Sequence, residues 1–231
     1  MPLSLEPIAL IRTDYPEKFG VPRQSGLARA ARGKIELLPG YRQPEALREL
    51  HRFTHLWVLF HFHLAEGWKP LVRPPRLGGN ERLGVFASRS PFRPNSLGLS
   101  VYEIESIEEK AGVISVTGVD VVDGTPVFDL KPYLPYCDAL PEAAEGFATR
   151  PSSPLEQAVI EVGADAAEAW EGTSRAFREL LAQTLRQDPR PSYQRDERSY
   201  GMHLGPYALR WQVLEEKRFF LLALKPLPET T

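Results

Sequence analysis

Short strand-like runs separated by glycine, proline and asparagine turns dominate the first 136 residues of the chain. The runs are rich in valine, isoleucine, leucine and aromatic residues, which favour strands. They cover residues 5–11, 34–38, 54–63, 83–87, 99–107 and 113–122. Because helices do not alternate with these runs, the pattern favours a sandwich or barrel over a parallel βαβ sheet. One short helix is predicted at residues 44–52, where Pro44 opens the first turn and apolar residues repeat at helical spacing.

The composition changes after residue 137. Residues 138–155 are rich in alanine, glutamate, proline and serine, which predicts a linker. Beyond them we expect a strand at 158–162, a helix capped by Thr173 or Ser174, and two closing strands at 207–214 and 218–224. The helix carries Phe177, Leu180, Leu181 and Leu185 on one face. The fold class is therefore mainly β, with a β domain over 1–137, a linker over 138–155 and a small α+β domain over 156–231.

Cysteine content and hydropathy restrict the class of protein. Cys137 is the only cysteine, which excludes an intrachain disulfide and a multi-cysteine metal site. No run approaches the roughly 18 apolar residues of a membrane span. The N-terminal residues lack the basic stretch and apolar run of a signal peptide. We expect a cytoplasmic protein.

The charge distribution carries more information than the net charge of −2. Residues 67–100 hold six basic side chains against Glu81 alone, whereas residues 101–171 have a net charge of −12. Six cations in a row of loops predict an electropositive patch unless the fold disperses them.

Motifs for several common chemistries are missing from the sequence. There is no Rossmann glycine fingerprint, no phosphate-binding loop, no H-E-x-x-H and no G-x-S-x-G. His61 and His63, two residues apart in a predicted strand, would face the same side and leave a metal site open as a hypothesis. A third ligand at a characteristic spacing is absent, so we expect no metal.

Four turns pinned by proline or glycine stand out. They lie at residues 21–24, 72–80, 88–95 and 123–126. Proline fixes φ and glycine permits positive φ, so such loops hold unusual shapes on a β scaffold. Arginines in them are suited to phosphate or carboxylate groups, although they could also be tied to backbone carbonyls. The turns alone predict a site for a small polar or anionic ligand.

Together the turns resemble the TrmO/TsaA (YaeB-like) family. The matching strings lie at residues 17–24, 53–57, 72–80, 84–89, 93–100, 120–126, 129–133 and 187–193. The resemblance covers nearly the whole chain. Two departures are Leu64, where many members have glutamine, and Ser96, where proline is usual.

The resemblance implies a single-sheeted β-barrel with a small C-terminal domain, a homodimer, and S-adenosylmethionine bound without a Rossmann domain. The implied activity is methylation of N6 of threonylcarbamoyladenosine at position 37, next to the anticodon of a threonine tRNA. Carried over by position, the cofactor-binding residues are Pro22, Arg23, Gln24, His63, Leu64, Arg89, Leu99, Asp123, Gly124, Thr125 and Pro126.

Methyl transfer from a sulfonium depends mainly on positioning, and the carbamoyl group makes the N6 proton more acidic, so a modest base suffices. Asp129 and Tyr133 are the catalytic candidates, with Asp123 as a third. We expect the anticodon stem-loop to contact Arg73, Arg76, Arg93, Asn95, Arg190 and Arg195.

Two alternatives remain open. One is a non-catalytic regulatory module that binds S-adenosylmethionine or a nucleoside. The other is a metal-dependent hydrolase that uses His61 and His63.

Overall fold

The computed structural model describes residues 4–74, 81–148, 158–190, 198–214 and 218–228. By its internal contacts the chain forms two compact units. The first, called here the barrel unit, comprises residues 1–12, 33–117 and 124–152. The second, the sheet unit, comprises 13–32, 118–123 and 153–231. The units are not consecutive along the chain, and the domain boundaries expected at 137 and 156 stay a prediction.

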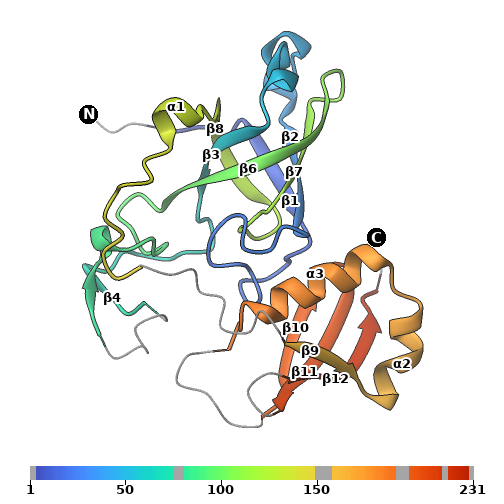
Figure 1. The fold of residues 1–231 in the computed structure, drawn as a ribbon. Coiled ribbons are helices and arrows are strands. Elements are labelled where there is room, and N and C mark those ends of the chain that lie inside the picture. Colours follow the sequence, from blue (N-terminus) through green and yellow to red (C-terminus); the bar gives the residue numbers. More distant parts are fainter. Residues whose placement is uncertain (1–3, 75–80, 149–157, 191–197, 215–217, 229–231) are drawn as a thin grey trace. The chain divides into compact units, whose positions relative to one another are not determined.

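The barrel unit is built on a closed sheet in the order β1-β2-β7-β6-β3-β8 (Figure 1). The strands are β1 (Ala9–Thr13), β2 (Arg32–Leu37), β3 (His55–His61), β6 (Leu97–Glu108), β7 (Val113–Thr117) and β8 (Thr125–Pro132). The single-sheeted barrel is thereby confirmed.

Alternation along the strands fills the barrel. In β3, Leu56, Val58 and Phe60 are buried, while the residues between them are half-exposed. Such a period of two places one face in the core and the other outside. Gly98 of β6 lies opposite Phe60, and a Cβ at this position would overlap the phenylalanine ring. The barrel thus encloses large apolar side chains, and a residue without a side chain is needed opposite the Phe60 ring.

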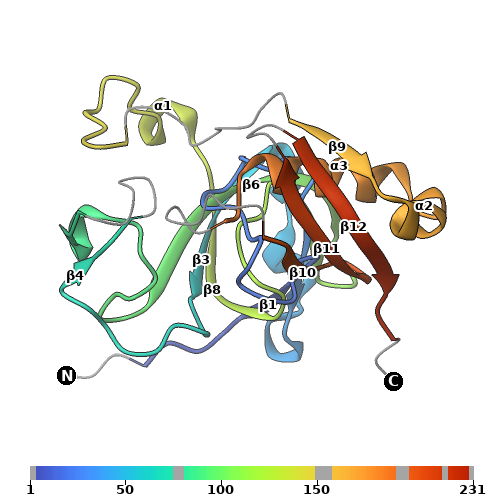
Figure 2. The ribbon, with the colours of Figure 1, turned by 90° about the horizontal axis from the view of Figure 1, so that it is seen from below.

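The sheet unit holds a four-stranded sheet in the order β10-β11-β12-β9 (Figure 2). Its strands are β9 (Val159–Val162), β10 (Tyr200–Leu204), β11 (Tyr207–Leu214) and β12 (Arg218–Pro226). β9 is parallel to β12, and helix α2 (Ala164–Glu171) packs on both. Helix α3 (Arg175–Arg186) is capped by Ser174, whose Oγ accepts a hydrogen bond from Phe177 N at 3.1 Å. The expected small α+β region is confirmed.

Minor elements complete the barrel unit. β4 (Leu71–Val72) pairs with β5 (Leu83–Gly84), and α1 (Pro135–Asp138) follows β8. Among the described residues, no helix has the length and apolarity needed to cross a membrane.

Two sequence predictions of local structure were wrong. Residues 44–52 do not form one helix, because Glu49 adopts a left-handed conformation (φ 67°) between two 3-10 turns, Pro44–Leu47 and Leu50–Arg52. The strand predicted at 83–87 ends at Gly84, and Val85–Ala87 form a 3-10 turn. Strand β8, strand β10 and helix α2 were not predicted.

Candidate functional site

The ends of β3, β6 and β8 meet at one edge of the barrel unit. His61 of β3 pairs with Leu97 of β6, and Phe60 pairs with Val127 of β8. The chain therefore leaves β3 and reaches His63 and Leu64 at the end of the barrel where β8 begins. Leu99 lies opposite Leu59, two residues from the same edge. The register brings together predicted cofactor residues that are up to 63 positions apart in sequence: His63, Leu64, Leu99, Gly124, Thr125 and Pro126.

This edge, called here the β3–β6–β8 edge, is apolar and open. Leu64 and Leu99 are 42% and 56% exposed, unusually high for leucine. Gly124 has φ +74°, and its N–H donates to Ile11 O at 2.9 Å, which fixes the turn before β8. Thr125 is buried. Apolar side chains therefore lie beside a turn in which Gly124 has no side chain.

The two catalytic candidates lie four residues apart, Asp129 within β8 and Tyr133 just after its end. Asp129 pairs with Leu59, which also pairs with Leu99, so these three residues form one row across the barrel. Asp129 Oδ1 accepts from Leu130 N at 3.0 Å, and its Oδ2 lies 3.6 Å from Lys131 Nζ. Tyr133 instead packs on Trp57, with ring centroids 5.8 Å apart, and its N–H bonds to His55 O. Four residues of strand, or ~13 Å, separate their backbones, so only Asp129 lies close to the β3–β6–β8 edge.

The basic residues predicted to bind RNA differ in their surroundings. Arg93 donates to Val85 O (3.2 Å) and Ser88 O (2.8 Å), so its guanidinium ties its own loop together. Arg73 is exposed and has no hydrogen bond or ion pair among the described residues. Asn95, the uncharged residue of this set, is exposed on a loop, as is Arg89, which is predicted to bind the cofactor. Arg76 and Arg195 lie outside the described residues.

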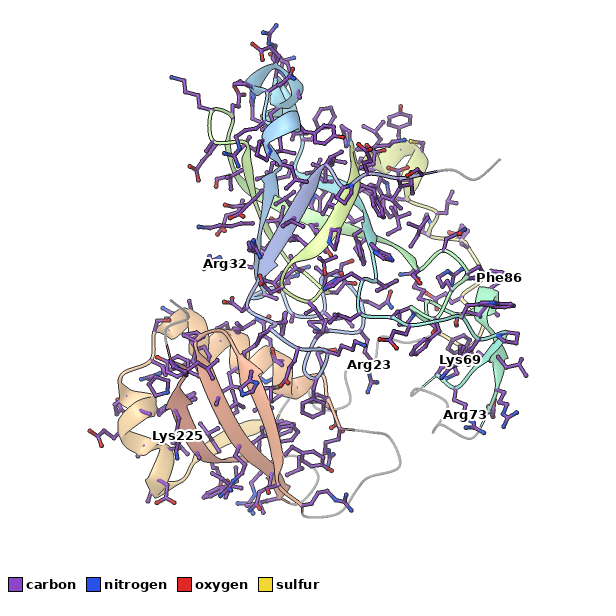
Figure 3. The ribbon with its side chains drawn as sticks, turned by 180° about the vertical axis from the view of Figure 1, so that it is seen from behind. Arg23, Arg32, Lys69, Arg73, Phe86 and Lys225 are labelled. Atoms are coloured by element: carbon purple, nitrogen blue, oxygen red, sulfur yellow. The ribbon has the colours of Figure 1, made fainter. Side chains whose placement is uncertain are left out.

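Arg73 belongs to a basic and aromatic surface around β4 and β5, called here the β4–β5 surface. Figure 3 shows Lys69, Arg73 and Phe86 on this segment. Lys69 Nζ lies 4.7 Å from the Phe92 ring, and Phe86 is 75% exposed. Val85 N donates to Pro70 O at 2.9 Å, which joins the two sides of the surface. The cationic stretch therefore remains partly clustered in the fold.

Four other predicted cofactor residues, Pro22, Arg23, Gln24 and Asp123, belong to the sheet unit. Arg23 Nη2 donates to Asp188 O at 3.3 Å, beside a half-buried Gln24 and a buried Pro22. Asp123 Oδ1 accepts from Thr13 N at 2.9 Å, and Asp123 N donates to Tyr15 O. Asp123 therefore also shapes the chain around residue 14.

Arg190 is held by an ion pair. Its Nε and Nη2 donate to the two carboxylate oxygens of Asp188 at 2.7 and 3.0 Å. Only 11% of the Arg190 side chain is exposed. A guanidinium with this geometry stabilises the chain just after α3 and has fewer groups available for phosphate.

The histidine pair does not have the predicted geometry. β3 ends at His61, and His63 N donates to His61 O at 2.8 Å in a tight turn. Because His63 lies beyond the end of the strand, the two side chains do not lie on one face of it as predicted. Within the described ranges, no three histidine, cysteine, aspartate or glutamate side chains gather as metal ligands would.

A pocket in the sheet unit was missed from the sequence. It is lined by Asp14 and Arg32 together with residues of α3 and of the β10–β11 turn. None of the site residues selected from the sequence lines it. The only local signal was the Thr173–Ser174 cap, which marked the start of α3 but gave no indication of what lies opposite.

Two family models match successive parts of the chain. The family model for the tRNA-methyltransferase O N-terminal domain matches residues 10–139, and that for the TrmO C-terminal domain matches residues 157–227. A protein of Escherichia coli (strain K12) named tRNA (adenine(37)-N6)-methyltransferase is 41% identical, covering 96% of this chain and 97% of its own. A Pseudomonas aeruginosa protein named putative S-adenosylmethionine-dependent methyltransferase RcsF is 46% identical over 90% and 91%.

Solved structures agree. A crystal structure of TrmO from Pseudomonas aeruginosa superposes with a TM-score of 0.80 at 38% identity and covers 98% of both chains. Both halves of the sequence and the fold as a whole therefore match one family. The chain belongs to the tRNA-methyltransferase O family.

Proposed function

We propose that this chain transfers the methyl group of S-adenosylmethionine to N6 of threonylcarbamoyladenosine at position 37 of a threonine tRNA, giving N6-methyl-N6-threonylcarbamoyladenosine. The observation that carries the proposal is the match to the E. coli tRNA (adenine(37)-N6)-methyltransferase over nearly the full length of both chains. Family membership supports the coarser activity, S-adenosylmethionine-dependent methylation of adenine N6 in tRNA. The threonylcarbamoyl group and the threonine tRNA are the finer part of the proposal.

The residues at the β3–β6–β8 edge fit S-adenosylmethionine, which supplies a sulfonium-bound methyl group when bound. The exposed faces of Leu64 and Leu99 suit the flat adenine and the apolar carbons of such a ligand. A Cβ at Gly124 would meet nothing closer than Arg12 Nη1 at 3.7 Å, so a ligand can approach this backbone. We assign cofactor binding to His63, Leu64, Arg89, Leu99, Gly124, Thr125 and Pro126 of the barrel unit. For Pro22, Arg23, Gln24 and Asp123, the assignment to cofactor binding rests on the family resemblance alone.

Asp129 is the proposed acceptor of the N6 proton. Its Oδ1 accepts a hydrogen bond from Leu130 N, and its Oδ2 lies 3.6 Å from Lys131 Nζ. Because the carbamoyl group acidifies the N6 proton, a carboxylate suffices to accept it. Tyr133 is assigned a packing role against Trp57.

The β4–β5 surface is the proposed contact for the anticodon stem-loop. Lys69 and Arg73 supply positive charge for phosphates, and the exposed Phe86 ring supplies a face on which an unpaired base can stack. We further propose a homodimer located in the cytoplasm. The half-exposed apolar side chains on the outer face of β3 and β6, such as Trp57, Leu59 and Val101, are suited to cover by a second subunit.

Methyl transfer to defined tRNA tests the proposal. The purified chain is incubated with S-adenosylmethionine carrying a labelled methyl group and with threonine tRNA that has or lacks the threonylcarbamoyl group. We expect label only in the modified tRNA. Equal labelling of both tRNAs would refute the finer substrate, and absence of label from both would refute methyl transfer itself.

The regulatory alternative has one observation in its favour. A Pyrococcus abyssi relative named probable S-adenosyl-L-methionine-binding protein is 35% identical and covers 66% of this chain and 79% of its own. Cofactor binding without label in any tRNA would support that reading. The hydrolase alternative has no comparable support from the described residues.

A further inference from the structure

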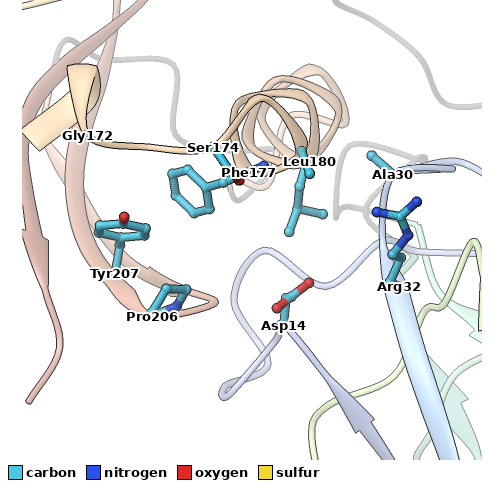
Figure 4. A pocket seen from close by; sticks show the side chains of 10 residues that line it. Asp14, Ala30, Arg32, Gly172, Ser174, Phe177, Leu180, Pro206 and Tyr207 are labelled. Atoms are coloured by element: carbon cyan, nitrogen blue, oxygen red, sulfur yellow. Dashed lines mark hydrogen bonds between the residues drawn. The ribbon is translucent and has the colours of Figure 1, made fainter. Parts of the chain in front are cut away.

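The pocket of the sheet unit has a volume of about 370 Å³, within the range of small-ligand sites (Figure 4). Four segments of the unit line it: Asp14 after β1, Ala30 and Arg32 before and in β2, the start of α3, and the β10–β11 turn. It is distinct from the proposed cofactor and catalytic residues, none of which lines it.

One wall of the pocket is apolar and partly aromatic. Phe177 and Leu180 of α3, which are 8% and 3% exposed, line the pocket on this side. Tyr207 packs on Phe177 with ring centroids 4.5 Å apart, and the exposed Pro206 precedes it. Figure 4 shows these rings on one side of the pocket. A half-buried tyrosine ring backed by phenylalanine gives a stable face on which a flat group can stack.

The opposite wall carries charge. Asp14 is half-buried, and among the described residues no donor lies within hydrogen-bond distance of its carboxylate. Gly205 N donates to Asp14 O at 2.7 Å, so the backbone of this residue is fixed. Burial raises the pKa of Asp14, the positive charge of Arg32 lowers it, and Asp123 raises it. A fixed, partly desolvated carboxylate without a donor favours a ligand that brings N–H groups.

The charged groups also provide for an anion. The guanidinium of Arg32 lines the pocket beside Asp14. Ser174 caps α3 at the same place, so the positive end of the helix dipole faces the cavity. A ligand with a flat ring, N–H donors on one edge and a negative group on its other side would match the aromatic wall, the Asp14 carboxylate and the Arg32 guanidinium.

A guanosine nucleotide has this combination. Guanine presents two parallel N–H donors, N1–H and N2–H, which match the two oxygens of one carboxylate, and its phosphate would face Arg32. We propose that this pocket binds an unpaired guanosine of the tRNA substrate, with the base stacked on Tyr207 and its Watson–Crick edge on Asp14. The inference rests on the proposed function for the identity of the RNA, but not for the chemistry of the pocket.

The test measures tRNA affinity by fluorescence anisotropy, together with KM and kcat for methyl transfer. Asp14→Asn removes one acceptor and should weaken tRNA binding and raise KM about tenfold, with kcat at saturating tRNA unchanged. Tyr207→Ala should act similarly, and Tyr207→Phe, which keeps the ring, should bind as the wild type does. Glu168→Gln on the exposed face of α2 is the matched control for loss of a carboxylate and should have no effect.

Changes in the RNA keep the test valid even if Asp14→Asn folds poorly. Each unpaired guanosine of the tRNA is replaced in turn by inosine, which lacks N2–H. One replacement should weaken binding to the wild type severalfold and have no further effect on Asp14→Asn. If no replacement weakens binding, or if Asp14→Asn and Tyr207→Ala keep the wild-type KM, the pocket does not read guanosine in the tRNA.

Free nucleotide separates the two sources of the same chemistry. Guanosine 5′-monophosphate should bind the pocket and compete with tRNA, whereas adenosine 5′-monophosphate should not. If the free nucleotide binds but the tRNA variants behave as the wild type, the pocket serves a small molecule and the tRNA inference fails. Failure of methyl transfer by the wild type would refute the proposed function and leave the tRNA-binding measurements interpretable.

Discussion

The hydroxyl of Tyr15 lies 3.1 Å from the hydroxyl of Thr184, and both side chains are buried. The two residues are 169 positions apart, and both belong to the sheet unit. Burial raises the pKa of Tyr15 well above its ordinary value, so the phenol stays neutral and can donate or accept in this bond. The N-terminal segment is thus part of the packing around α3.

Removing this hydrogen bond should destabilise the sheet unit. Tyr15→Phe leaves the fully buried Thr184 hydroxyl without the tyrosine, which we expect to lower the free energy of unfolding by about 1–3 kcal/mol. Thr184→Val should cost a similar amount. The double variant should lose less than the sum of the two, because it buries no orphaned hydroxyl. Urea unfolding of the four proteins measures the coupling, and strict additivity would contradict it.

The helices and strands show what the sequence could and could not predict. Periodicity and capping predicted α3 and most barrel strands, because those signals are local. β8 was missed because Pro126 and Pro132 lie at its two ends and Phe128 interrupts its pairing with β3. The helix at 44–52 was wrong because the left-handed conformation of Glu49 is not visible in spacing.

The candidate site shows the same limit. The resemblance selected residues around Leu64, Leu99 and Gly124, and the register of three strands then placed them at one edge. The pocket formed by Asp14, Arg32 and Tyr207 could not be predicted, because no local motif links residues separated by most of the chain. Their proximity is a property of the fold alone.

Acid should weaken one contact of the barrel unit specifically. Asp138 Oδ2 accepts from Leu134 N at 2.8 Å and from Trp57 Nε1 at 2.9 Å, and these bonds, that from Leu134 first, lower the pKa of Asp138. A lowered pKa stabilises the folded state above the unfolded value of about 3.9, and this contribution is lost as pH falls through the folded value.

Asp138→Asn should therefore be less stable than the wild type at neutral pH and equally stable once both are well below that folded pKa. The urea midpoint of both proteins, followed from about pH 7 downward, measures the convergence. A constant difference at all pH values would show that the charge of Asp138 does not contribute.

The positions of Asp129 and Tyr133 predict unequal roles in methyl transfer. Asp129 lies in the row that includes Leu99, whereas Tyr133 packs at the far end of β3. Asp129→Asn should lower kcat by about 100-fold or more without weakening S-adenosylmethionine binding. Tyr133→Phe keeps the ring that packs on Trp57 and should retain nearly full activity. Calorimetric titration of the cofactor and single-turnover methyl transfer distinguish the two effects, and the reverse ranking would refute the assignment of Asp129.

Arg73 and Arg93 of the cationic stretch should respond differently to removal. Arg73 is exposed and makes no hydrogen bond among the described residues, so Arg73→Ala should leave stability unchanged. If Arg73 contacts a phosphate of the anticodon loop, the variant should bind tRNA more weakly, and the log–log slope of affinity against salt should flatten by about 0.7.

Arg93 donates to Val85 O and Ser88 O, so Arg93→Ala should instead lower the thermal midpoint and loosen the loop that carries Phe86. Melting curves and anisotropy titrations at several salt concentrations separate these outcomes. An Arg73→Ala protein with the wild-type affinity and salt slope would show that the β4–β5 surface does not bind the tRNA backbone through this residue.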